Sequence, residues 1–258
     1  MPFYEQSGQP LRFSVGPTFS FWPHLHRQVE CLWLPEGALE LTIEGTPWRM
    51  GPGDLGLVWP NCVHSYRELS PGRLVVCVAD LTCLPHVRGA FARNDCPRPV
   101  LPAAQLHPDA VWALRNVVTE PCPGPELQRA YLEVALGRAL EVLPLVPAEG
   151  QTQPDLLHAA LRYLAVHFRD TLNLDELART LYVNKYTLSR MFSKQIGCSL
   201  RNYVNQLRVE AAQAELRFTE HSVAEVAERC GFASERSFYR VFRELTGQSP
   251  AQYRAAAP

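Results

Sequence analysis

Four side chains in the first quarter of the chain, His24, His26, Glu30 and His64, have the chemistry of metal ligands. On a strand, His24 and His26 point to the same face, because side chains alternate along an extended chain. Glu30 can reach that face from the following strand, and His64 can close the set from a facing strand. Three imidazoles and a carboxylate suit Zn, Fe, Ni or Mn and leave coordination positions open for water or a substrate.

The same groups also suit a pocket that binds an organic effector by hydrogen bonds without a metal, or a purely structural role. Aromatic residues are dense in this region, and a ring can stack on a sugar face or on an aromatic ligand. The residues expected to contact an effector are His24, His26, Glu30, His64, Trp33 and Tyr66. The pattern requires no cofactor, and a divalent transition metal (Zn, Ni, Fe or Mn) is the one candidate.

A second set of side chains, near the C-terminus, has the chemistry of DNA recognition. A bidentate arginine suits O6 and N7 of guanine, and hydroxyl groups can bond to bases or phosphates. The set comprises Lys185, Tyr186, Ser189, Arg190, Lys194, Arg236, Ser237, Tyr239, Arg240 and Arg243. The chain has only two lysines, and both belong to this set.

Charge is distributed unevenly along the 258 residues, although the net charge is only −1. Residues 1–154 carry 11 basic and 15 acidic side chains, a balance of −4, whereas residues 155–258 carry 14 and 11, a balance of +3. The second half is therefore the candidate polyanion binder. No apolar run approaches the roughly 20 residues that span a bilayer, and the N-terminus lacks a signal-peptide pattern, so we expect a cytoplasmic protein without a membrane partner.

The proline-rich stretch at residues 144–154 cannot continue a helix or a sheet and is expected to link two domains. Before it, residues 12–79 form short aromatic and β-branched runs broken by Gly and Pro, which favours an antiparallel barrel or sandwich. Helices are expected at residues 109–119 and 126–143. An apolar stripe over residues 132–143 suits packing on the protein's own barrel, or pairing between the two copies of a homodimer.

Residues 155–258 look all-helical and repeat themselves at an offset of 49 to 50 residues. Each copy has the pattern helix, turn, helix. The first copy is expected at residues 174–181 and 185 to about 195; the second begins at the capping box of Ser222 and Glu225 and ends with a helix from 235 to about 245. Residues 200–218 contain no helix breaker, so they are expected to form one helix of about 28 Å that could hold two reading helices about one DNA turn (≈ 34 Å) apart.

The second helix of each copy has an apolar face and a polar face. The apolar positions expected in the core are Leu188, Met191, Phe192, Phe238, Val241 and Phe242. One interpretation is that these polar faces serve only solvation, as the polar face of any surface helix does. Two matched copies with arginines at the same positions favour DNA recognition instead.

Residues 156–254, about 40% of the chain, resemble the DNA-binding domain of the AraC/XylS family of transcription regulators. The most specific matching stretches are Leu188-Ser189-Arg190-Met191-Phe192, Phe238-Tyr239-Arg240-Val241-Phe242 and Gly247-Gln248-Ser249-Pro250-Ala251-Gln252-Tyr253-Arg254. The resemblance implies that two recognition helices enter successive major grooves. It places Tyr186, Ser189, Arg190, Arg236, Tyr239 and Arg240 at the reading positions. Asn184 stands where the family often has serine, and it caps a helix equally well.

The first half resembles the cupin motifs found in the sensor domains of AraC-like regulators. The first motif is matched by His24-Leu25-His26, Glu30 and Gly37, and the second by Pro52-Gly53-Asp54, Asn61 and His64. Asn61 replaces a glycine that is usual before the last histidine, and Trp59 stands where proline is common. The resemblance implies a double-stranded β-helix, the cupin type of barrel.

These observations predict an α+β protein with two domains. Residues 1–143 are expected to form a cupin-like, effector-binding antiparallel β-barrel with a helical extension, residues 144–154 a linker, and residues 155–258 an all-α domain with two helix-turn-helix motifs. We expect a transcription regulator, not an enzyme, that binds double-stranded DNA and responds to a small molecule such as a sugar or an aromatic metabolite. RNA polymerase and a second copy of the chain are expected partners. The rival hypotheses are a cupin metalloenzyme with a helical appendage and a sensor in which a metal is itself the signal.

Overall fold

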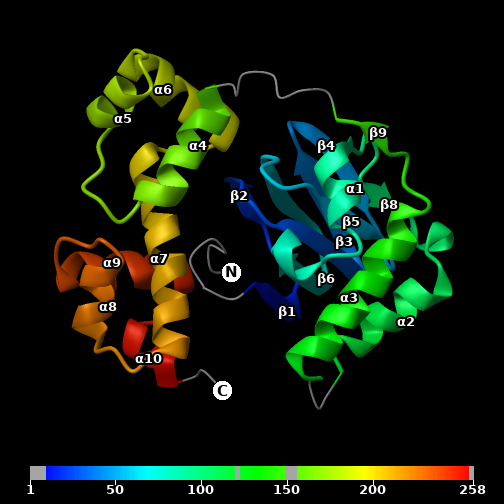
Figure 1. The fold of residues 1–258 in the computed structure, drawn as a ribbon. Coiled ribbons are helices and arrows are strands. Elements are labelled where there is room, and N and C mark those ends of the chain that lie inside the picture. The colour runs from blue at the N-terminus through cyan, green and yellow to red at the C-terminus, as the bar shows by residue number, and fades with distance from the viewer. Residues whose placement is uncertain (1–9, 120–122, 149–155, 256–258) are drawn as a thin grey trace. The chain divides into compact units, whose positions relative to one another are not determined.

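The computed structural model of the chain describes residues 10–119, 123–148 and 156–255 (Figure 1). The chain divides into two compact units: one spans Gln9–Gln153, and the other begins at Pro154 and runs to the C-terminus. Each unit has its own hydrophobic core, and each is described by itself below. The predicted α+β organisation, a β-rich first half and a helical second half, is confirmed.

The first unit is built on an antiparallel sheet, as the short runs between Gly and Pro predict. Its main strands are β1 (Leu11–Pro17), β2 (Phe21–His24), β3 (Val29–Ile43), β4 (Thr46–Met50), β5 (Leu55–Val58), β6 (His64–Ala79) and β8 (Val100–Leu101). The two long strands, β3 and β6, pair with each other over most of their length, and register shifts bend them near their middle. The first half of β3 also pairs with β5, and its second half pairs with β4.

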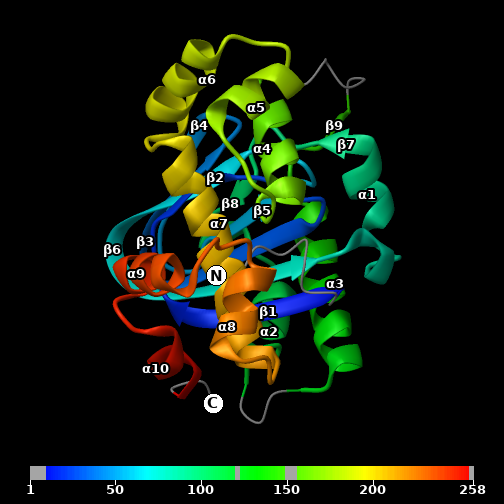
Figure 2. The ribbon, with the colours of Figure 1, turned by 90° about the vertical axis from the view of Figure 1, so that its left-hand side faces the viewer.

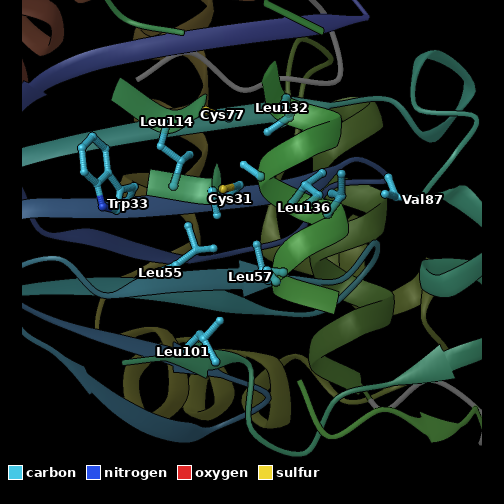
Figure 3. Close-up of a cluster of buried hydrophobic side chains, with 14 of the residues drawn as sticks. Cys31, Trp33, Leu55, Leu57, Cys77, Val87, Leu101, Leu114, Leu132 and Leu136 are labelled. Atoms are coloured by element: carbon cyan, nitrogen blue, oxygen red, sulfur yellow. The ribbon is translucent and has the colours of Figure 1, made fainter. Parts of the chain in front are cut away.

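Side chains of β3 alternate between the two faces of the sheet. Cys31 and Trp33 point to one face, where they join an apolar cluster with Leu55, Leu57 and neighbouring strand residues (Figure 3). Glu30, the residue before Cys31, points to the other face. The sheet therefore separates an apolar layer from an interior that holds polar side chains.

Helices cover the apolar face of the sheet. They are α1 (Arg88–Arg93), α2 (Pro108–Asn116) and α3 (Pro125–Leu140), and short 3-10 turns lie at Leu81–Cys83 and Ala103–Gln105. Leu132 and Leu136 of α3 lie in the same cluster as Trp33 and Leu114 (Figure 3). The stripe over residues 132–143 thus packs on the sheet of its own chain, which was the first of the two alternatives. Homodimerisation stays a prediction. The buried residues of this stripe are not available as the contact surface of a dimer.

Part of the predicted linker is a strand, so the expectation that residues 144–154 take no part in a sheet is wrong there. Val146–Pro147 forms β9, which pairs with β7 (Asn94–Asp95). Proline is tolerated in an edge strand because its missing N–H need not face a partner. The next residue, Ala148, donates its backbone N–H to Arg93. Residues 149–154 of the predicted linker lie outside the described residues.

The second unit is helical and contains the two predicted helix-turn-helix motifs (Figures 1 and 2). Its helices are α4 (Leu156–His167), α5 (Leu174–Thr180), α6 (Lys185–Met191), α7 (Leu200–Phe218), α8 (Val223–Arg229), α9 (Glu235–Thr246) and α10 (Pro250–Ala255). The predicted bounds of α7 are confirmed. Capping boxes are present at both motif starts, at Asn173 with Glu176 and at Ser222 with Glu225.

The first reading helix is less regular than its sequence predicts. The α-helix ends at Met191, and a π-helical turn, Phe192–Ile196, continues it to Gly197. The matching helix of the second copy, α9, stays α-helical to Thr246. The two copies share the length of this segment, but not its hydrogen bonding.

The turns of the two motifs share a left-handed residue. In the first copy Tyr182 has φ +55° and is 96% exposed, and in the second copy Gly231 has φ +84°. Arg208 of α7 donates hydrogen bonds to the backbone carbonyls of Phe168 and Asp170. The carbonyl of Arg169, between them, lies against Gly231, and a Cβ built on Gly231 would meet this oxygen at 2.3 Å.

One carboxyl group, that of Glu210 in α7, is fully buried in this unit. Its Oε1 accepts a hydrogen bond from Gln206, while Oε2 has no hydrogen-bond partner in the described part of the chain. Burial raises the pKa of this carboxyl to about 8, because a charged carboxylate loses its hydration there.

Across residues 10–119, 123–148 and 156–255, no helix combines the length and the apolar character that crossing a bilayer requires.

Alanine at two left-handed glycines should have unequal effects. Gly197 and Gly231 both have φ +84°, so Ala costs about 1–2 kcal/mol of backbone strain at each. At Gly231 the collision with Arg169 adds roughly 1–3 kcal/mol, whereas a Cβ at Gly197 meets nothing within 4 Å. Thermal unfolding followed by far-UV circular dichroism checks the difference. Equal losses of stability in the two variants would show that the backbone at residues 169–170 moves away from the added Cβ at no cost in free energy.

Glu210→Gln should stabilise the second unit more at pH 8 than at pH 5. The unfolded carboxyl ionises near its ordinary pKa, but the folded one stays protonated up to about pH 8, so the wild type loses stability as the pH rises between these two values. The amide cannot ionise, and the gain at pH 8 should exceed that at pH 5 by on the order of 2 kcal/mol. Urea unfolding at both pH values measures it. Glu228→Gln, at an exposed carboxyl, is the control, and the same pH dependence in both variants would refute the assignment.

Candidate functional site

The structure brings the four predicted metal ligands together inside the first unit. His24 ends β2 and lies directly opposite His64, the first residue of β6, while Glu30 is the second residue of β3. His26 lies beyond the end of β2, in the loop that leads to β3, and not on a strand with His24 as expected. All four side chains are buried, and one ligand atom from each lies within 4.8 Å of the others.

Hydrogen bonds to the backbone orient the three imidazole rings. Nδ1 of His24 lies 3.0 Å from the carbonyl oxygen of Trp22, Nδ1 of His26 lies 3.1 Å from that of Gln28, and Nδ1 of His64 lies 2.9 Å from that of Cys62. Since a carbonyl only accepts, each Nδ1 carries the proton and each Nε2 is the remaining nitrogen. This is the arrangement in which protein histidines bind metals through Nε2.

The carboxylate of Glu30 is bound at both oxygens. Oε2 lies 2.9 Å from Nε2 of His26 and 3.6 Å from Nε2 of His64, and the hydroxyl of Tyr66 donates to Oε1. Burial works to raise the pKa of Glu30, but the hydrogen bond with His26 and the nearby imidazole of His64 outweigh burial and hold the pKa well below its usual range. Burial and the neighbouring His64 lower the pKa of His24, so that ring is neutral.

This donor set fits a divalent transition metal. Nε2 of His64 is buried and makes no hydrogen bond within the described residues, so a lone pair is available there. Nε2 of His26 and Oε2 of Glu30 lie 2.9 Å apart, and a bound cation would take both atoms as ligands. An anionic carboxylate and imidazole nitrogens are ligands that Zn, Fe, Ni and Mn accept.

Asn61 performs the conformational role of the glycine that it replaces. It has φ +65°, a left-handed conformation that asparagine tolerates better than most residues. Its backbone N–H donates to the carbonyl of His26 at 2.7 Å. This bond joins the loop before His64 to the loop that carries His26, so the departure from the usual motif leaves the ligand geometry intact.

Trp33 does not join this site, contrary to expectation. Three positions from Glu30 on β3, it points to the opposite face and packs in the apolar cluster beneath the helices (Figure 3). Tyr66 is in place, through its contact with Glu30. Two aromatic residues outside the predicted set, Phe19 and Phe21, lie beside it: the ring of Phe21 is 4.6 Å from that of His24, and the ring of Phe19 is 5.7 Å from that of Tyr66.

A register shift in β2 explains why Phe21 was missed. Phe21 pairs with Tyr66 and His24 pairs with His64, so the four residues 21–24 of β2 lie opposite the three residues 64–66 of β6. Simple alternation would put Phe21 and His24 on opposite faces, but the extra residue brings both to the face of Tyr66 and His64. The alternation of Phe19 with Phe21 was the signal available in the sequence.

In the second unit, nine of the ten predicted DNA-binding side chains are exposed, and Ser237 is half-buried. The predicted core positions are confirmed, because Leu188, Phe192, Phe238 and Phe242 are buried beneath these faces. Lys194 lies in the π-helical turn instead of the α-helix. Two cations of the set have partners.

Nζ of Lys185 lies 3.0 Å from Asp175, and Nη1 of Arg240 lies 3.4 Å from Glu244. Both pairs are solvent-exposed, and such pairs contribute little to stability. They hold the cations weakly and leave them available to another anion.

Comparison with known proteins identifies both halves. A helix-turn-helix domain family matches residues 177–256, and a cupin domain family matches residues 11–79. The uncharacterised HTH-type transcriptional regulator YobQ of Bacillus subtilis is 26% identical over 232 residues, which are 90% of this chain and 88% of YobQ. An uncharacterised HTH-type transcriptional regulator of Staphylococcus aureus is 32% identical over 104 residues, which are 40% of this chain but only 14% of that longer protein.

Among solved structures, ToxT from Vibrio cholerae has the same fold. It superimposes with a TM-score of 0.59 over 97% of this chain and 99% of its own, at 13% identity. Both sequence domains and the architecture agree with the expected family. The chain thus carries a cupin domain followed by an AraC-type helix-turn-helix domain, the two domains that its resemblance to the AraC/XylS family predicts.

Proposed function

We propose that the protein is a sequence-specific, DNA-binding transcription regulator whose two reading helices enter adjacent major grooves of double-stranded DNA. The observation that carries this proposal is the duplicated helix-turn-helix motif with a cationic, exposed face on each second helix, α6 with its π-helical extension and α9. Arginine at matching positions of both copies, Arg190 and Arg240, suits bidentate contact with guanine. The reading set is the one predicted from the sequence.

The connecting helix supports simultaneous engagement of both motifs. α7 runs for 19 residues without a break, about 28 Å at 1.5 Å per residue. Adjacent major grooves on one side of the duplex are about 34 Å apart. A continuous helix of this length keeps the two motifs close to the separation that the DNA requires.

The cupin domain is proposed to supply the signal. Its buried quartet of His24, His26, Glu30 and His64 is built to bind a divalent transition metal, either as the signal itself or as the anchor for a small organic effector beside Tyr66. A ligand changes DNA binding only as far as it binds one arrangement of the protein more tightly than another. RNA polymerase, a second copy of the chain and a cytoplasmic location belong to the same proposal.

Arg240→Ala should weaken binding to the preferred site by about 1–3 kcal/mol and relax the preference at one base pair, because a bidentate base contact is lost. The preferred site is obtained by selection from a random library with the intact protein, and affinity is measured by fluorescence anisotropy. A uniform loss over all sequences would make Arg240 a phosphate contact. The companion variant Lys194→Ala should weaken binding to all sequences alike and lower the salt slope by about one.

The intact protein should bind about one equivalent of Zn, Ni, Fe or Mn. His64→Ala should reduce the metal affinity at least 100-fold, because the variant lacks one of the ligand atoms. Mutation of residues that only hydrogen-bond to a metal ligand already lowers metal affinity by about 10–100-fold. Isothermal titration calorimetry and metal analysis measure both. His86→Ala is the control, since His86 lies on the surface beside Glu133. If the wild type binds no metal, the organic effector remains the alternative. A metal that supports catalytic turnover without changing DNA affinity would favour the rival metalloenzyme.

A further inference from the structure

A groove of about 670 Å³ lies between the two helix-turn-helix motifs. Ser189 and Ser193 line it from the first motif, and Ser237 and Arg240 line it from the second. Three of these four residues belong to the predicted reading set. The groove therefore lies between the two reading faces and is bordered by both.

Helix α7 contributes one face to this groove. Arg201 and Asn205 lie four residues apart, and Arg208 follows three residues later, so the three share a helix face. Arg208 is already engaged, because its guanidinium donates to the carbonyls of Phe168 and Asp170. Arg201 is exposed and has neither an ion pair nor a hydrogen bond from its side chain within the described residues.

The geometry of DNA dictates what faces this groove when both reading helices are bound. Two successive major grooves on one side of the duplex are separated by the minor groove and the two sugar-phosphate ridges that border it. A surface that joins two helices inserted into those major grooves must be concave, because it has to receive these ridges. The groove is concave, and the helix between the motifs presents to it the guanidinium of Arg201, which has no side-chain partner among the described residues.

We propose that Arg201, assisted by Asn205, binds a backbone phosphate of the DNA segment between the two major grooves. This contact carries no base information. It positions α7 against the duplex and so fixes the register of both reading helices. The proposal rests on the DNA-binding function proposed above, and it adds a phosphate site that lies on neither reading helix.

The experiment uses the full chain and a duplex of about 30 base pairs, selected by the intact protein from a random library so that both half-sites fit. Affinities of the wild type, Arg201→Ala and Arg201→Lys are measured by fluorescence anisotropy over a range of salt concentrations. Arg217→Ala is the control: Arg217 is exposed on the same helix, but 16 residues further on and about 160° around its axis. Circular dichroism confirms that each variant is folded.

Arg201→Ala should bind the selected duplex roughly tenfold more weakly, the effect of one charge-assisted hydrogen bond. The salt slope should fall by about 0.9, the preferred sequence should be unchanged, and Arg201→Lys should retain the slope. Arg217→Ala should match the wild type. An unchanged slope in Arg201→Ala would overturn the proposal.

Duplexes with a single neutral methylphosphonate locate the contact. Neutralising one phosphate between the two major grooves should weaken the wild type roughly tenfold and leave Arg201→Ala unaffected, because the partner of that phosphate is already absent. Equal losses in both proteins would overturn the proposal while the DNA-binding function stands. If the wild type selects no sequence from the library, the proposed function itself fails, and the two results are therefore distinguishable.

Discussion

The distance between the two helix-turn-helix motifs is set by one uninterrupted helix, and the DNA-binding unit depends on it. α7 begins at a capping serine, Ser199, and contains no proline or glycine over its 19 residues. Both motifs pack on this helix. Arg208 on its side donates hydrogen bonds to the carbonyls of Phe168 and Asp170, in the segment that leads into the first motif. Because the spacing is built into a rigid rod, it does not have to be recreated by flexible loops each time that the protein meets DNA.

A different constraint organises the cupin domain, namely a negative charge in a buried position. Glu30 is fully buried, and an unpaired carboxylate there would be expensive. Histidine nitrogens and the Tyr66 hydroxyl surround it, and backbone carbonyls hold each histidine ring in turn. Glu210 shows the contrasting case, since Gln206 is its one hydrogen-bond partner within the described ranges and burial keeps it neutral. Two buried glutamates in one chain thus take opposite charge states because their partners differ.

The local signals in the sequence were sufficient for most of the helical unit. Caps, left-handed glycines and the absence of breakers act over a few residues, so the bounds of α7 and the capping box of Ser222 and Glu225 follow from the sequence alone. The π-helical turn after Met191 was missed because it changes the hydrogen bonding without changing the apolar pattern. The strand at Val146–Pro147 was missed because its partner, at residues 94–95, is far away in the sequence.

The candidate metal site was predictable in its members and less so in its surroundings. Residue type and spacing identified the four ligands, but the register shift that places Phe21 beside His24 depends on a pairing between strands that no local pattern reveals. Trp33 is different, because its place was predictable: an odd separation from Glu30 on one strand puts the two side chains on opposite faces.

The left-handed turn residues affect how the two duplicated motifs can diverge. In the second copy, the Arg169 carbonyl occupies the space of any side chain at position 231, so glycine is the only residue that evolution can keep there without rebuilding the neighbouring loop. In the first copy, Tyr182 adopts the equivalent conformation with its ring in solvent, and many residue types are sterically admissible. The space around the first turn therefore admits side chains that the second turn excludes, so natural variation among related regulators should concentrate in the first turn.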